Sequence, residues 1–313
     1  MTEASYLDIP PPANRSIGDK GARGRVVIFS KRFKMSYFTR LVKETLANTR
    51  MAGWLGRIPF VEAAYGRYAL FRTNHTGLFY GVYGSYEEAL AAIPPSRLAG
   101  WDNEASASIW VDNIHQLNPY FIQLSSYAVL FWLLRIIREG TSLIDFGGSI
   151  GLTYYRYLRF ASLPANARWT VVELPKIVAE GRRVAAREAA INLEFETAIE
   201  AVPECDILLS AGALQLMERS VPGLLEMRAA KPPHIILNKI SLTPGEAYWT
   251  LQNYGPAISP YRVYNEAEFI GYFENAGYEL VDRWAVPELD CYVPFHPERC
   301  VPAFAGFYFA KQD

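Results

Sequence analysis

Short apolar runs alternate with amphipathic segments through the second half of the chain. The runs are rich in Val, Ile and Leu and cover 141–146, 169–172, 205–210 and 234–238. Apolar residues recur at helical spacing in the segments 119–140, 152–158, 177–190 and 221–230. Strands buried on both faces form continuous apolar runs, and strands that alternate with helices form a parallel sheet. The pattern therefore predicts an α/β fold of the doubly wound type.

The chain ends with a different order of elements. A helix is predicted over 266–276, followed by a strand over 278–284 and a second strand over 303–311. Because no full helix separates these two strands, we expect them to pair as an antiparallel hairpin at the edge of the sheet. Dehydrogenase sheets usually lack such a hairpin.

Three regions follow from the change in composition along the chain. Residues 1–25 are rich in Pro, Gly and charge and predict a flexible arm. Residues 26–118 mix helical segments with aromatic loops and predict a mostly helical, aromatic-rich cap domain. Residues 119–313 then form the sheet-containing domain. Within it, the aromatic stretches 248–264 and 289–301 are expected to be loops near the carboxyl ends of the strands.

A glycine-rich turn follows the first apolar run. Asp145 is the acid at the strand end, and Ser149 lies inside the turn. The turn contains three glycines, Gly147, Gly148 and Gly151. Glycine lets the backbone curl tightly and approach a ligand closely. A dinucleotide fingerprint, G-x-G-x-x-G, would place glycine where Ser149 and Leu152 stand. An NAD(P)-dependent oxidoreductase is therefore the weaker interpretation, and a cofactor without a pyrophosphate is favoured.

A second acid ends the next predicted strand. Glu173 lies 22 residues beyond Gly151 (173 − 151). An acid at about this distance can accept hydrogen bonds from both ribose hydroxyls of an adenosine. The alternative is a helix N-terminal acid that the helix dipole favours. We expect ribose binding by Glu173, with Leu174 beside it in the same cofactor site.

These motifs together resemble one protein family. The acid-x-G-x-x-x-G spacing of Asp145, Gly147 and Gly151 resembles motif I of class I methyltransferases that use S-adenosyl-L-methionine (SAM). The similarity to a bacterial family of such enzymes, found in surface-polysaccharide and natural-product gene clusters, extends from about residue 78 to the C-terminus. It is carried by 81–89, 145–151, 169–175 and 210–218. The resemblance implies SAM as the cofactor, and a Rossmann-like sheet of seven strands in which the sixth and seventh form the antiparallel hairpin.

The resemblance implies methyl transfer but does not identify the acceptor. We expect a small molecule, such as a natural-product or sugar-type metabolite, methylated by an in-line displacement that depends mainly on positioning. A methyltransferase-like protein that has lost catalysis and acts as a binding protein is a further alternative. Ligands of open α/β sheets lie outside the carboxyl ends of the strands. Acceptor-facing residues are therefore expected at 210–215, at 239–243 and in the two late loops.

Individual side chains can be given expected roles, each with a structural alternative. Ser210 and Tyr127 are expected to contact SAM, with core packing as the alternative for Tyr127. The expected acceptor contacts are Gln215, Gln252, Asn253, Tyr254 and Tyr292. Gln215 is also a catalytic candidate, as are His296 and His115, because imidazole titrates near neutrality. The alternatives are bonding to loop backbone for the amides and a structural or exposed position for the histidines.

Composition and charge limit the remaining choices. The chain has 313 residues, half of them hydrophobic, and a net charge of −1, which argues against a general nucleic-acid binder. Three widely spaced cysteines, Cys205, Cys291 and Cys300, indicate reduced thiols in a cytoplasmic protein, with no metal site and no disulfide framework. The N-terminus lacks a signal-peptide pattern, and no apolar run is long enough to span a membrane. The expected partner is the small-molecule acceptor, and a homodimer remains open.

The first 60 residues carry eleven Lys or Arg and four Asp or Glu, a charge of +7 (11 − 4) in a chain whose net charge is −1. The favoured interpretation is a solvated helical face. The other interpretation is a patch for an anionic partner, such as a membrane surface or an acidic acceptor.

Overall fold

A computed structural model of the protein describes residues 60–73, 77–108, 111, 123–202, 204–218, 221–226 and 230–312. All of these belong to one compact unit, Val42–Asp313. The arm predicted over 1–25 lies outside the described residues, as does nearly all of the basic N-terminal segment. None of the helices in the described ranges is long and apolar enough to cross a membrane.

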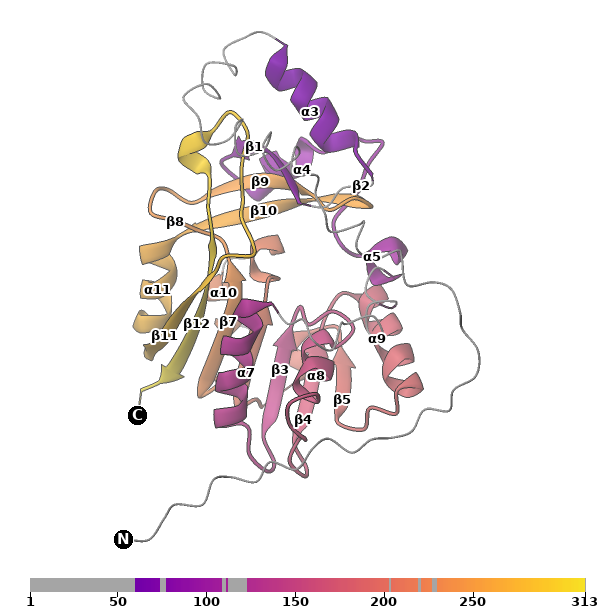
Figure 1. Ribbon diagram of the computed structural model, residues 1–313, viewed down its shortest axis with the longest axis vertical. Helices are drawn as coiled ribbons and strands as arrows, with labels where there is room; N and C mark the ends of the chain where they lie inside the picture. Colours follow the sequence, from indigo (N-terminus) through magenta and orange to yellow (C-terminus); the bar gives the residue numbers. More distant parts are fainter. Residues whose placement is uncertain are drawn as a thin grey trace, which may run out of the picture. The chain divides into compact units, whose positions relative to one another are not determined.

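Seven strands form the larger sheet, and their order confirms the sheet expected from the sequence (Figure 1). They are β3 (Ser142–Phe146), β4 (Arg168–Val172), β5 (Leu193–Glu196), β6 (Ile207–Ala211), β7 (His234–Ile240), β11 (Tyr278–Val286) and β12 (Phe304–Lys311). Across the sheet they lie in the order β11-β12-β7-β6-β3-β4-β5. β12 is antiparallel to both of its neighbours, β7 and β11, whereas the other neighbouring pairs are parallel. This is a Rossmann-like α/β fold, with the predicted hairpin formed by the last two strands.

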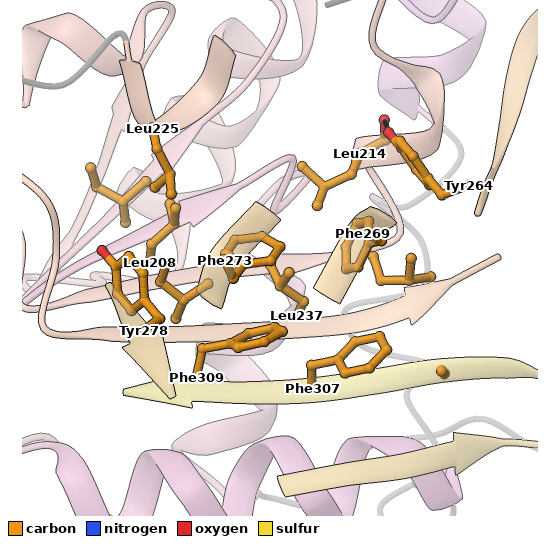
Figure 2. Packing of buried hydrophobic residues seen from close by; sticks show 14 of the residues in the cluster. Leu208, Leu214, Leu225, Leu237, Tyr264, Phe269, Phe273, Tyr278, Phe307 and Phe309 are labelled. Atoms are coloured by element: carbon orange, nitrogen blue, oxygen red, sulfur yellow. Dashed lines mark hydrogen bonds between the residues drawn. The ribbon is translucent and has the colours of Figure 1, made fainter. Parts of the chain in front are cut away.

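Helices cover both faces of this sheet. They are α7 (Leu124–Ile136), α8 (Leu152–Tyr157), α9 (Pro175–Arg187), α10 (Val221–Glu226) and α11 (Glu266–Asn275). Buried residues of α7, α8 and α9 pack in one cluster with Trp169 of β4, and those of α10 and α11 pack in another. Figure 2 shows Phe269 and Phe273 of α11 against Phe307 and Phe309 of β12. Their ring centroids are 5.6 Å apart for the first pair and 4.4 Å apart for the second. This aromatic packing holds α11 against β12 of the hairpin.

A second, smaller sheet joins segments that are far apart in the sequence. Its strands are β1 (Leu78–Tyr83), β2 (Leu98–Ala99), β8 (Leu242–Thr243), β9 (Tyr248–Asn253) and β10 (Ala257–Asn265). β9 lies between β1 and β10, and β10 also pairs with β2 and β8. The helices before the larger sheet are α3 (Val61–Phe71), α4 (Tyr86–Ala91) and α5 (Glu104–Ser108). Residues of α3 and α4 pack on one face of this sheet, against Trp249 and Leu251 of β9.

The expectation of a loop over 248–264 is wrong, because this stretch forms β9 and β10. The strands are stabilised by pairing with β1, where Leu78 lies opposite Asn253. The other late stretch, 289–301, is largely irregular, with one bridge between Cys291 and Val301. The described 3-10 turns are η1 (Ile199–Ala201), η2 (Leu214–Leu216) and η3 (Pro297–Arg299). The domain boundary near residue 118 stays a prediction, although β1 shares a sheet with the late strands.

Candidate active site

The glycine turn connects β3 to α8 at the carboxyl ends of β3 and β4. The Gly147 amide donates a hydrogen bond to the Val172 carbonyl, 2.9 Å away, which holds the turn against the end of β4. Gly147 has a φ of +70°, and a β-carbon there would lie 2.1 Å from Cβ of Ala213. A β-carbon at Gly148 would lie 2.4 Å from Cγ of Asp145. Both glycines are therefore required by the protein's own packing, independently of any ligand.

Asp145 is buried, with none of its surface exposed. The Trp169 indole N–H donates to the carboxyl oxygen Oδ2 at 3.3 Å, whereas Oδ1 has no hydrogen-bond partner in the described part of the chain. Burial raises the pKa of Asp145 to about 7; the bond from Trp169 opposes this shift and the charge of Glu173 adds to it. Leaving a buried acceptor without a donor costs free energy. A ligand that brings a hydrogen-bond donor or a positive charge would therefore be stabilised at Asp145.

Glu173 follows β4 and contacts the turn directly. Its Oε1 accepts from the Ser149 amide at 3.1 Å, and its Oε2 accepts from the Leu174 amide at 2.9 Å. Burial raises the pKa of Glu173, and the two backbone bonds oppose the rise. The nearby charge of Asp102 also raises this pKa, and Asp102 is an acid that the sequence interpretation missed. The turn then ends at Gly151, the N-cap of α8, with a φ of +89°. Carboxylate oxygens accept more than one hydrogen bond, so Glu173 can hold the turn and still accept from a ligand.

Ser210 and Gln215 lie at and after the carboxyl end of β6. Both are buried, and the Ser210 hydroxyl has no partner among the residues described. The Gln215 Nε2 donates to the Lys239 carbonyl and to the Tyr261 hydroxyl, the latter at 3.3 Å. Gln215 therefore links η2 to the end of β7 and to the middle of β10, which favours the backbone-bonding alternative. Its Oε1 remains without a described partner, so a ligand contact stays a prediction.

The three predicted acceptor residues of β9 and its turn are placed differently. Asn253 donates to the carbonyls of Ala69 and Arg72 and accepts from the Gly255 amide at 2.8 Å. Tyr254 stacks on a tryptophan ring and shares its hydroxyl with neighbouring backbone and side chains. Both residues are buried and committed to these bonds, so the structural alternative accounts for them. Gln252 is half-buried on the opposite face of the strand, and its acceptor role stays a prediction.

The remaining candidates lie in several parts of the fold. His296 is half-buried before η3, with Nδ1 3.5 Å from a carboxylate oxygen of Glu298. Tyr292 is half-buried in the same irregular stretch. Tyr127 is 51% exposed on α7 and packs edge-on against Phe160. His115 lies outside the described residues. None of these positions decides the predicted roles, and Tyr127 contributes little to the core.

A small cavity at the ends of β6 and β7 contains two basic residues that the sequence interpretation did not assign. It has a volume of about 20 Å³ and is lined by Ser126, Val129, Leu130, Thr153, Arg156, Ala211, Asn238 and Lys239. Burial and the neighbouring Arg156 lower the pKa of Lys239 to about 8. Burial also lowers the pKa of Arg156. Lys239 begins the stretch that was expected to face the acceptor. Arg156 lies four residues after the buried Leu152 on α8, and this spacing could have indicated that Arg156 points toward the protein interior.

No group of three or more His, Cys, Asp or Glu side chains that could hold a metal ion occurs among the residues that the structure describes.

No protein-family model and no curated protein sequence matches the chain. Comparison with solved structures does find similar proteins. One similar structure is 1,6-didemethyltoxoflavin-N1-methyltransferase from Burkholderia thailandensis, bound to 1,6-didemethyltoxoflavin and S-adenosylhomocysteine. It is 17% identical, with a TM-score of 0.42 over 71% of this chain and 98% of that chain. A SAM-dependent methyltransferase from Aquifex aeolicus is 16% identical, with a TM-score of 0.42 over 64% and 98%. Magnesium protoporphyrin IX methyltransferase from Synechocystis PCC 6803 is 14% identical, with a TM-score of 0.42 over 68% and 90%.

Proposed function

We propose that this protein is a SAM-dependent methyltransferase that acts on a small-molecule acceptor. The observation that carries the proposal is the buried Asp145 with one unpartnered carboxyl oxygen, at the end of a central strand and beside a glycine turn. The residues present fit SAM. Glu173 offers carboxylate oxygens to the ribose hydroxyls, and Asp145 offers an oxygen to a donor on the amino-acid part.

When bound, SAM supplies an electrophilic methyl group on a sulfonium. The protein then has to hold an acceptor in line with that methyl group, and such positioning contributes up to ~7–11 kcal/mol in favourable cases. The glycine turn and Glu173 fix the donor side. The ends of β6 and β7 and the face of the smaller sheet that carries Gln252 are the proposed acceptor side. A general base is needed only where the acceptor arrives protonated.

The acceptor that we propose is a natural-product or sugar-type metabolite. Supporting a polar acceptor are the Ser210 hydroxyl and the Gln215 Oε1 at and after the end of β6, which have no hydrogen-bond partner among the described residues. Membership of the gene-cluster family noted above is part of the same proposal. The proposal also includes a cytoplasmic location and no nucleic-acid partner, and the net charge of −1 favours the latter. It leaves the choice between a monomer and a homodimer open.

Isothermal titration calorimetry with S-adenosylhomocysteine (SAH), SAM and NADH tests the cofactor. We expect SAM and SAH to bind and NADH not to bind. Micromolar binding of NADH without binding of SAM would instead establish the oxidoreductase alternative. The inactive alternative predicts SAM binding with no methylated product from any acceptor, which mass spectrometry of reactions with metabolite extracts and methyl-labelled SAM would detect.

A further inference from the structure

Two basic side chains line the small cavity beside the glycine turn. Arg156 comes from the last turn of α8, and Lys239 from the carboxyl end of β7. Two acids are near: Asp145 raises the pKa of Arg156, and Glu288 raises that of Lys239. Neither acid comes within the 4.0 Å of an ion pair, and neither basic side chain has a hydrogen-bond partner in the described ranges. Their N–H groups are therefore available to a ligand.

The walls of the cavity are held in place by other bonds. Asn238 donates to the Ser125 hydroxyl at 3.3 Å, and its Oδ1 accepts from the Trp284 indole at 3.0 Å. Lys239 has a φ of +63°, a left-handed conformation that is strained for a residue with a side chain. The Gln215 amide holds the Lys239 carbonyl in that conformation. Strained residues held by their surroundings are concentrated at functional sites.

The position of the cavity relates it to the cofactor site. In the order β7-β6-β3-β4, Glu173 follows β4 and Asp145 lies on β3, whereas the cavity is lined by the ends of β6 and β7. A ligand that extends from Glu173 past Asp145 along the strand ends therefore reaches Arg156 and Lys239. Two cations with free donors at the end of this path match an anionic group.

We propose that Arg156 and Lys239 form a subsite for the carboxylate of a bound ligand. A guanidinium presents two parallel N–H groups that match the two carboxylate oxygens, and an ammonium adds a point charge. The inference rests on the proposed function, because two ligands of such an enzyme could carry the group: the amino-acid end of SAM, or an acidic acceptor. The chemistry is the same in both cases.

Calorimetry on the full-length chain distinguishes the two sources. Arg156→Gln and Lys239→Met are compared with Arg67→Gln and Lys311→Met, which remove exposed basic side chains elsewhere. Two ligands are titrated, SAH and 5′-methylthioadenosine, which keeps the adenosine and sulfur but has no amino-acid group. If SAM supplies the carboxylate, the site variants bind SAH at least about tenfold more weakly and 5′-methylthioadenosine within about twofold of wild type, because truncating one partner of a buried charge pair weakens binding strongly.

A second titration addresses the acceptor. Benzoate, with benzamide as its neutral control, is added to protein saturated with SAH and followed by NMR. If the acceptor supplies the carboxylate, wild type binds benzoate but not benzamide, and both site variants lose benzoate binding while keeping SAH binding. The inference is overturned if both variants bind SAH, 5′-methylthioadenosine and benzoate like wild type.

Failure of the proposed function gives a different result. Wild type would then bind neither SAH nor 5′-methylthioadenosine, and benzoate binding to the ligand-free protein and its variants would still decide the subsite.

Thermal unfolding of the ligand-free variants is the folding control. If either neutral variant unfolds, Arg156→Lys keeps the charge without the two-pronged geometry, and the subsite predicts weakened but measurable binding of the carboxylate ligand. Unchanged binding by Arg156→Lys would then contradict the proposed two-pronged contact.

Discussion

Asp145 carries a carboxyl group in surroundings that disfavour its charge. Its pKa of about 7, against an ordinary 3.8, means that the native state keeps a proton that the unfolded chain releases. The free energy of unfolding of the ligand-free protein should therefore fall as pH rises from about 4 to about 7. Asp145→Asn removes this dependence, and we expect it to stabilise the ligand-free protein at pH 8 by on the order of a few kcal/mol. Urea unfolding at pH 5 and pH 8 measures both effects; an unchanged pH profile in the variant would contradict the assignment.

Glu173 is expected to bind the ribose hydroxyls. Glu173→Ala should weaken SAM binding by about 1.5–3 kcal/mol for each charged hydrogen bond lost. Calorimetry measures the change, with Glu194→Gln as a control because Glu194 is exposed on the edge strand β5. The substitution also removes the bonds to the Ser149 and Leu174 amides, so thermal unfolding of the ligand-free variant separates a disordered turn from a lost ligand contact. Wild-type affinity for SAM in Glu173→Ala would show that the ribose lies elsewhere.

Gly147 combines a positive φ with a close neighbour. Gly147→Ala should destabilise the protein by about 2–5 kcal/mol, because it adds overpacking against Ala213 to left-handed strain. The double variant Gly147→Ala, Ala213→Gly removes the 2.1 Å contact and should recover the packing part only. Gly100→Ala is the matched control for strain alone, since Gly100 has a φ of +73° and no atom lies within 4 Å of the position that a β-carbon would take there. Equal losses in Gly147→Ala and Gly100→Ala would show that packing at the turn is not limiting.

Single residues were predictable where a local rule applies. The glycine turn after β3 and the acid at the end of β4 follow from local spacing, whereas the hydrogen bond of Glu173 to the turn was not predicted. The role of Arg156 did not follow, because the cavity that it lines is formed by α7, α8, β6 and β7 together. The unpartnered oxygen of Asp145 did not follow either, because it depends on how Trp169 of β4 packs against the carboxyl group. The bonds of Asn253 could not be predicted for the same reason, since its partners at 69 and 72 lie about 180 residues earlier in the chain, and its acceptor role stays a prediction.

The bonds of Asn253 join α3 to the turn between β9 and β10. Asn253→Ala removes its donors to the carbonyls of Ala69 and Arg72, and leaving buried carbonyls unpaired costs about 1–3 kcal/mol. We expect that loss of unfolding free energy in urea, with SAM affinity unchanged. Gln252→Ala, the neighbour on the opposite face, is the control and should change stability by less than about 0.5 kcal/mol. Equal stability of the two variants would contradict this structural role and favour the predicted acceptor contact.

Six of the seven strands of the larger sheet were predictable because each is bounded by local signals, whereas the four-residue β5 was not placed from the sequence. β9 and β10 were not, because Gly255, Pro256 and Pro260 indicate turns and the tyrosines give no strict alternation. This stretch forms strands because β9 pairs with β1. A pairing strand so far away in the sequence cannot be identified from local residue patterns. The short β2 and β8 depend on β10 in the same way.

The pairing of β1 with β9 also bears on the predicted domain boundary. A chain limited to residues 119–313 would lack β1, and would leave β9 as an unpaired edge with an exposed apolar face. We therefore expect that shortened chain to aggregate, whereas Val42–Asp313 remains monodisperse and folded. Size-exclusion chromatography and circular dichroism of the two chains make the comparison. A stable, monodisperse 119–313 chain would establish the boundary as predicted and show that the smaller sheet does not need β1.

The order in which the chain is made gives the same pairing a kinetic meaning. Leu78 pairs with Asn253, which is translated 175 residues later (253 − 78). At ~5–20 residues per second, β1 is made about 9 to 35 seconds before its partner exists. During that interval its hydrogen-bonding edge and the apolar side chains of Leu78 and Phe79 have no β9 to pair with. The folding yield in a cell should accordingly depend on chaperones that bind nascent chains, more than the stability of the finished protein would suggest.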